Sequence, residues 1–180
     1  MKKDFIMPVL VLTIICLVIG GALALTNDAT APIITAASLE RRDAAMLDKI
    51  PQADGFEIFY EQGQGSTELY GQTLPASILE IYSTTNNVGY IFIAAVPGYS
   101  GHITVITAVD PNGQIIKTST LSHTETQGIG TIIEKPSFLD TFIGRDNTLE
   151  GVDTVAGATV TTRAYIRAIQ DKMIAFDMLP

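Results

Sequence analysis

The sequence has few of the residues that build disulfides, metal sites or basic surfaces. Its single cysteine, Cys16, cannot form an intrachain disulfide, a thiolate metal site or an iron–sulfur cluster. The two histidines, His102 and His123, have no second ligand at a plausible spacing, so we expect this chain to bind no metal. Lys and Arg total 11 against 19 Asp and Glu, and no basic run exceeds two residues. We therefore expect no nucleic-acid partner.

Length and composition favour one folded domain with a short appendage. The chain has 180 residues, of which 47% are hydrophobic and only 17% are charged. Its glycines and prolines follow no period. Together these values argue against collagen-like, disordered and coiled-coil classes, and they allow a packed core.

An uncharged apolar run covers residues 5–25. As a helix at about 1.5 Å per residue it would be roughly 30 Å long, about the thickness of a bilayer core. Lys2 and Lys3 precede it, so the positive-inside rule predicts a cytoplasmic amino terminus in the inner membrane, with residues 26–180 extracytoplasmic. The alternative is a cleaved signal peptide, with a candidate site at residues 22–24, but the run is long for that class.

The rest of the chain predicts an α+β fold. Residues 26–32 resemble a polar linker, and a helix is expected from Thr35 or Ser38 to Ile50. We therefore divide the chain into a membrane segment (1–25), a linker and helix (26–54) and an extracytoplasmic domain (55–180). Alternating β-rich runs predict a mostly antiparallel sheet with packed helices, and they cover residues 56–60, 77–83, 89–96, 102–109 and 114–122.

Three shorter signals complete this prediction. The segment Asp110-Pro-Asn-Gly113 predicts a hairpin turn between the last two strands. A short helix is expected over Pro136–Phe142. The apolar stripe in residues 161–176 predicts a longer helix that packs on the sheet.

The segment after the last long strand, HTETQGIG (123–130), is a candidate ligand loop. Gly128 and Gly130 would let backbone N–H groups approach a ligand closely, beside an exposed Ile129. Glu125 and Thr126 add polar acceptors. The alternative is a tight turn that enters a helix.

The segment DTVAGATVTT (153–162) is the second candidate. Small residues at 156–158 remove bulk just before the hydroxyl of Thr159, and Thr161 or Thr162 could cap the following helix. A phosphate would fit beside Thr159, because the helix start favours an anion. Arg163 and Arg167 would add positive charge. The alternative is an ordinary capped helix.

The order of an amino-terminal membrane helix, GYSGHI (98–103), HTETQGIG (123–130) and DTVAGATVTTRA (153–164) resembles the FMN-binding subunits RnfG and NqrC. They belong to the ion-translocating ferredoxin:NAD and NADH:quinone oxidoreductases. The resemblance implies that a flavin transferase attaches FMN to Thr159 through a phosphoester, with Asp153 as its recognition residue. Ala156 stands where the family usually has Ser or Thr. Gln127 and Ile129 replace the usual Pro and Leu, and Ile129 can still lie against a flavin ring.

The compact length favours RnfG, an electron-transfer subunit of the Rnf complex that is not a complete enzyme alone. Its partners would be the other membrane subunits. The alternatives are an NqrC-like subunit or a membrane-anchored binding module without flavin. A hydrolase is disfavoured, because the chain has no G-x-S-x-G or H-E-x-x-H motif. Thr161 and Thr162 are fallback attachment points. The expected cofactor-binding residues are Thr159, Asp153, Gly157, Ala158, Thr161, Thr162, His123, Glu125, Thr126, Gly128, Ile129 and Gly130.

Overall fold

A computed structural model describes residues 2–63, 68–146 and 148–180. The chain divides into two units, Met1–Asp43 and Ala44–Pro180, which we describe separately. The first unit is helical, and the second holds a sheet with helices on its faces.

Helix α1 (Lys2–Lys49) supplies the first unit. Its section Met7–Ile34 has a mean hydropathy of 2.7 and exposes its side chains, as expected for a helix that can cross a membrane once. The expected polar linker at 26–32 is wrong, because this segment continues the helix. The hydroxyls of Thr26 and Thr30 donate to the carbonyls of Ala22 and Thr26 at 2.9 and 2.8 Å, so these polar groups are satisfied inside the helix.

The second unit is built on a five-stranded antiparallel sheet, as the alternating runs predicted. The order across the sheet is β1-β4-β5-β6-β7, so consecutive long strands are neighbours. The bounds are β1 (Phe56–Glu61), β4 (Ile78–Thr84), β5 (Tyr90–Pro97), β6 (His102–Val109) and β7 (Ile115–Ser122).

Two local features connect these strands. The turn at 110–113 forms as expected: the Asp110 carboxylate accepts from the N–H groups of Asn112 and Gln114, each at 2.9 Å, and Gly113 has φ +85°. A two-stranded sheet of β2 (Glu68–Leu69) and β3 (Gln72–Thr73) was not predicted. Strands of two residues are too short to show an alternating pattern.

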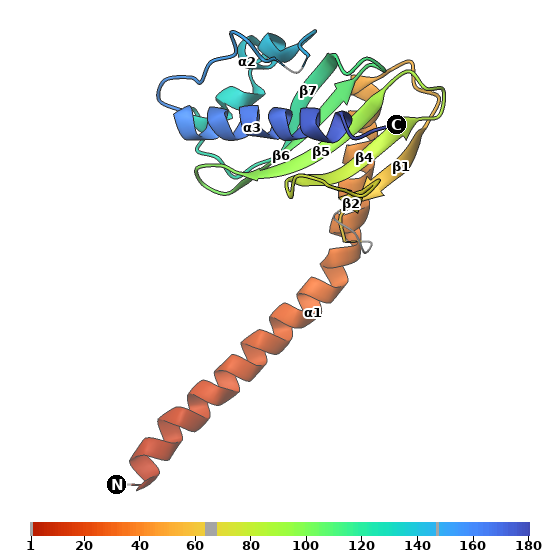
Figure 1. Cartoon of the computed structure of the whole chain (residues 1–180). Coiled ribbons are helices and arrows are strands. Elements are labelled where there is room, and N and C mark those ends of the chain that lie inside the picture. Colours follow the sequence, from red (N-terminus) through yellow and green to blue (C-terminus); the bar gives the residue numbers. More distant parts are fainter. Residues whose placement is uncertain (1, 64–67, 147) are drawn as a thin grey trace. The chain divides into compact units, whose positions relative to one another are not determined.

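One face of the sheet is covered by the carboxy-terminal half of the chain. Figure 1 shows α3 (Thr159–Phe176) lying across β5 and β6. Helix α3 begins at Thr159, before the expected start at residue 161. Beside it lie η1 (Gly130–Glu134), α2 (Pro136–Leu139) and η2 (Asp140–Phe142), which confirm the short helical region.

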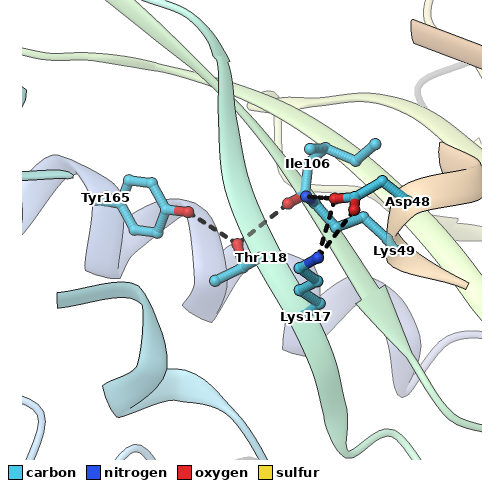
Figure 2. Close-up of polar contacts among 6 residues, drawn as sticks. All are labelled: Asp48, Lys49, Ile106, Lys117, Thr118 and Tyr165. Carbon is cyan, nitrogen blue, oxygen red and sulfur yellow. Dashed lines mark hydrogen bonds and ion pairs between the residues drawn. The ribbon is translucent and has the colours of Figure 1, made fainter. Parts of the chain in front are cut away.

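Tyr165 fixes α3 to the sheet. Its ring is fully buried and packs edge-on to Phe138, with centroids 5.4 Å apart. Thr118 Oγ1 donates to the carbonyl of Ile106 at 3.1 Å, so it accepts from the Tyr165 hydroxyl at 2.9 Å (Figure 2). Burial raises the pKa of Tyr165, which keeps this donor protonated.

The last residues of α1, 44–49, pack on the opposite face. Met46 and Ile50 are buried there with Ile91 and other sheet residues. Asp48 accepts from Lys117 on β7, with both of its oxygens 3.0 Å from Nζ (Figure 2). The sheet is thus covered on both faces. The amino-terminal end of α3 lies near the turn between β5 and β6.

Candidate functional site

The two candidate loops meet at one cavity. Its volume is about 350 Å³, within the range of small-molecule sites. The β5–β6 turn, the segment after β7 and the first turn of α3 form its walls. The lining residues are Tyr99, Glu125, Thr126, Ile129, Gly130, Gly157, Ala158, Thr159, Val160 and Thr161.

A second cavity of about 240 Å³ shares a wall with the first. Ile129, Gly157 and Ala158 line both of them. Gly128 and Ala156 are among the residues that line only the second. The contact between the loops therefore separates two adjoining hollows.

Glu125 is the polar centre of the first cavity wall, and it is only 8% exposed. Its Oε1 accepts from the backbone N–H groups of Tyr99 and Ser100 at 2.8 and 3.0 Å. Its Oε2 accepts from the Thr161 hydroxyl at 2.6 Å. One side chain therefore joins the β5–β6 turn, the segment after β7 and the start of α3.

Glycines provide the room for this carboxylate. A Cβ at Gly98 would collide with Glu125 Oε1, and a Cβ at Gly130 would lie 2.6 Å from the Cβ of Glu125. Gly101 is restricted in the same way by the Thr124 hydroxyl. Gly98 and Gly130 thus serve the packing around Glu125, a role that sequence reasoning did not assign to them, whereas Gly128 and Gly157 have open space beside them.

Hydrogen bonding keeps Glu125 ionised. Burial raises the pKa of its carboxyl, but the hydrogen bonds from Thr161, Ser100 and Tyr99 outweigh burial and lower the pKa below its usual value. The nearby His123 lowers it further. At neutral pH the cavity wall therefore contains a fixed negative charge.

The three threonines at the start of α3 differ in their surroundings. Thr162 is fully buried, and its Oγ1 accepts from Val155 N at 3.1 Å and donates to Ala158 O at 2.9 Å. Thr161 is buried and donates to Glu125. Thr159 is partly exposed, lines the larger cavity and makes one long contact of 3.5 Å to Val155 O. Of the three threonines, Thr159 is the one that is not buried and whose hydroxyl makes only a long contact, although Thr161 also lines this cavity.

The expected helix cap is wrong. Because α3 begins at Thr159, the N-cap residue is Ala158. Its methyl side chain cannot make a cap hydrogen bond. Thr161 and Thr162 lie inside the first turn instead of before it. The first N–H groups of the helix have no intrahelical acceptors, so they remain able to bind an anion.

The structure places three of the expected site residues outside both cavities: Asp153, His123 and Thr162. Asp153 is exposed on the loop before α3. The Nδ1 of His123 accepts from Glu125 N at 3.1 Å, so its Nε2 donates to Glu134 Oε1 at 3.0 Å. This geometry gives His123 a supporting role in the loop.

Tyr99 and Val160 also line the larger cavity, and sequence reasoning missed both. They are 72% and 52% exposed, and Ile129, which also lines this cavity, is 55% exposed. The signal available for Tyr99 was its place in GYSGHI. Val160 stands between two threonines that were singled out. The cavity is thus rimmed by apolar side chains and has polar groups at the helix start.

Sequence comparisons relate this chain to known proteins. Residues 98–173, which include both loops, match the FMN-binding domain family. The G subunit of the ion-translocating oxidoreductase complex of Cereibacter sphaeroides (strain ATCC 17029 / ATH 2.4.9) is 32% identical over 198 residues, which cover 98% of this chain and 86% of that protein. The protein of the same name from Pseudomonas aeruginosa (strain UCBPP-PA14) is 29% identical over 195 residues, or 98% and 90% of the two chains. The G subunit of the proton-translocating ferredoxin:NAD(+) oxidoreductase complex of Clostridium ljungdahlii is 24% identical over 170 residues, or 89% and 85%.

Proposed function

Because the chain belongs to the family formed by the G subunits of ion-translocating oxidoreductase complexes, we propose that it is an electron-transfer subunit that carries FMN on Thr159. The observation that carries this proposal is the partly exposed Thr159, which lines the larger cavity and whose hydroxyl makes only a long contact. When bound, FMN would supply the oxidation and reduction chemistry, and the protein would hold and orient it.

The surroundings of the three threonines favour Thr159 over Thr161 and Thr162 as the attachment point. Modification of Thr161 would break its hydrogen bond to Glu125 inside a buried contact. Modification of Thr162 would require a phosphate at a fully buried oxygen that already joins Val155 and Ala158. Thr159 loses only a long contact of 3.5 Å. Attachment at Thr159 therefore disturbs the fold least.

The start of α3 suits the phosphate of a bound FMN. Its unpaired N–H groups and its dipole favour a negative charge beside Thr159. Arg163 and Arg167 follow at intervals of four, so all three residues share one side of the helix. Gly157 has φ +85° and no atom within 4 Å of its absent Cβ, which leaves the approach to Thr159 open.

The flavin ring would lie against the apolar rim. Ile129, Val160 and Tyr99 expose apolar surface around the cavity, and a planar aromatic ring is stabilised by such contacts. A tether also keeps FMN at a high effective concentration outside the cytoplasm, where free FMN is not replenished. The residues therefore fit the two ends of FMN, the anionic phosphate and the apolar ring.

A flavin transferase would make the bond during maturation. The Thr159 Oγ would lose its proton and bind the phosphorus of an activated flavin phosphate, while the bond from that phosphorus to its leaving group would break. Asp153, Thr154 and Ala156 are exposed on the loop before Thr159. This exposure supports Asp153 as a residue that the transferase contacts, and not one that contacts the mature flavin.

We further infer the topology of the chain. Lys2 and Lys3 would hold the amino terminus in the cytoplasm, and the segment Met7–Ile34 would cross the inner membrane once. The FMN-binding domain, residues 55–180, would then lie outside, where cytoplasmic electron carriers cannot reach it. Electrons would pass between this flavin and a redox cofactor of a neighbouring membrane protein of the Rnf complex. Protease added outside spheroplasts should digest the domain, and protection from outside protease would contradict this topology.

The test of the flavin proposal is fluorescence on a denaturing gel. The full chain, produced together with a flavin transferase, should fluoresce at its own mass because the bond survives denaturation. Thr159→Val should lose this signal. The matched control is Thr154→Val, an exposed threonine of the same loop, which should keep it. A fluorescent Thr159→Val protein would contradict the proposal.

A further inference from the structure

The carboxylate of Glu125 joins three segments of the domain and also borders the cavity. It lies in the wall of the cavity to which Thr159 also contributes, and it is 8% exposed. A charged carboxylate is strongly disfavoured in such a place unless donors surround it. Here three donors, the N–H groups of Tyr99 and Ser100 and the hydroxyl of Thr161, lie at 2.6–3.0 Å.

The backbone around Glu125 is adapted to admit this charge. The side chain of Glu125 occupies the space that a Cβ at Gly98 or Gly130 would need. A neutral glutamine would have nearly the same shape and could still accept from both backbone N–H groups. A carboxylate differs from glutamine in two ways: both of its oxygens accept, here from Tyr99, Ser100 and Thr161, and it carries a full negative charge in the cavity wall.

We propose that the fixed negative charge of Glu125 lowers the reduction potential of the flavin held in this cavity. The inference rests on the proposed function, because it requires FMN at Thr159. Reduction adds electrons to the flavin, and negative charge builds up whenever fewer protons than electrons are taken up. A carboxylate in the wall repels that added charge and favours the oxidised flavin.

The expected size follows from Coulomb's law. A group that fills a cavity of about 350 Å³ lies within about 10 Å of a charge in the cavity wall. At an effective dielectric constant of about 20, that charge changes the equilibrium between oxidised and reduced flavin by about tenfold. For a two-electron couple, a tenfold change corresponds to a shift of about 30 mV. Water screens exposed carboxylates more strongly, so an exposed carboxylate at the same distance would shift the flavin potential less than Glu125 does.

Thr161 gives the proposal a second, opposite consequence. Its hydroxyl points its positive end at Glu125 Oε2 from 2.6 Å and partly offsets the negative charge. Thr161→Val keeps the volume and removes that donor, so it should strengthen the field of the carboxylate. Glu125→Gln removes the charge. The two variants should therefore shift the potential in opposite directions, whereas a general loosening of the cavity would shift both in the same direction.

The test is a redox titration of the flavin-loaded full chain in detergent, followed by flavin absorbance against a dye of known potential. Relative to wild type, Glu125→Gln should make the reduction potential more positive by about 30 mV, which corresponds to a tenfold change for a two-electron couple. Thr161→Val should shift it negatively. The control, Glu57→Gln, removes an exposed carboxylate on β1 that lies outside both cavities, and it should leave the potential unchanged.

The outcomes separate this inference from the proposed function. A loaded Glu125→Gln protein with the wild-type potential would overturn the inference and leave the flavin assignment intact. If Glu125→Gln does not load flavin, Thr161→Val decides, and an unchanged or positive shift in that variant overturns the inference. A wild-type chain without bound flavin would overturn both.

Discussion

The Oε2 atom of Glu125 accepts a hydrogen bond from the Thr161 hydroxyl at 2.6 Å, between residues 36 positions apart in the sequence. This contact joins the segment after β7 to the first turn of α3. Through Oε1 the same carboxylate also holds the turn that contains Tyr99. The cavity is thus fixed by a network of the protein's own residues.

Loss of the Glu125 side chain should destabilise the domain. Glu125→Ala would leave the buried Thr161 hydroxyl and the N–H groups of Tyr99 and Ser100 without this acceptor. Each unsatisfied group costs about 1–3 kcal/mol, so for three groups we expect the free energy of unfolding to fall by at least about 3 kcal/mol. Denaturant unfolding of detergent-solubilised chain would measure it. Glu134→Ala, at an exposed site, should change stability by less than about 1 kcal/mol. Equal losses in the two variants would contradict the role of Glu125.

The stability that Glu125 provides should disappear in acid. Because the pKa of this carboxyl is lower in the folded chain than in the unfolded chain, its contribution is complete above the ordinary value of about 4.3 and is lost as the pH falls through the lowered pKa. Glu125→Gln removes this titration. The difference in unfolding free energy between wild type and Glu125→Gln should therefore shrink below about pH 4. A difference that stays constant from pH 7 to pH 3 would show that the carboxyl does not titrate in this way.

Lys172 should show the opposite pH dependence. It is only 1% exposed, and its Nζ has no hydrogen-bond partner among the described residues. Burial lowers its pKa to about 8, although Asp177 and Asp110 act in the other direction. Because the unfolded chain binds this proton more tightly, stability should rise with pH between about 8 and 10.4. Lys172→Met should add about 1–3 kcal/mol at pH 7 and remove this rise. Thermal unfolding across that pH range would test it, and a destabilised Lys172→Met protein would contradict it.

Gly128 tests whether the loop before η1 affects the flavin. Its φ is +81°, so Gly128→Val introduces strain of about 1–2 kcal/mol and places a branched side chain beside the smaller cavity. We expect an altered flavin absorption spectrum with the covalent bond retained. Gly144 also has a positive φ, +72°, and open space around it, but lies outside both cavities. Gly144→Val should show similar strain and an unchanged spectrum. Identical spectra in the two variants would mean that the loop does not contact the flavin.

The sheet was predictable because its signals are local. Alternation along β5, β6 and β7 and the turn at 110–113 each depend on a few neighbouring residues. The prediction that the helix ends at residue 25 was wrong. The hydroxyls of Thr26 and Thr30 donate to carbonyls of their own helix, and composition alone does not show whether such polar side chains will form these bonds. Local polarity was therefore a poor guide to where α1 ends.

The site was predictable only in part. The small residues before Thr159 and the two glycines of the 123–130 loop mark it in the sequence. The role of Glu125 could not be predicted from the sequence, because its partners lie 25, 26 and 36 positions away and only the fold brings them together. Tyr99 was missed for the same reason. Sequence identified the segments that form the cavity, and the structure identified the contacts that hold them.

Peptide mass spectrometry can locate FMN on Thr159. The full chain, produced with a flavin transferase, would be digested and the peptide that contains residues 153–162 fragmented. We expect one FMN phosphoryl group on Thr159, with Thr161 and Thr162 unmodified because these residues are buried and their hydroxyls are hydrogen-bonded. FMN on Thr161 or Thr162, or an unmodified peptide from a chain that is fully folded and was exposed to active transferase, would contradict it.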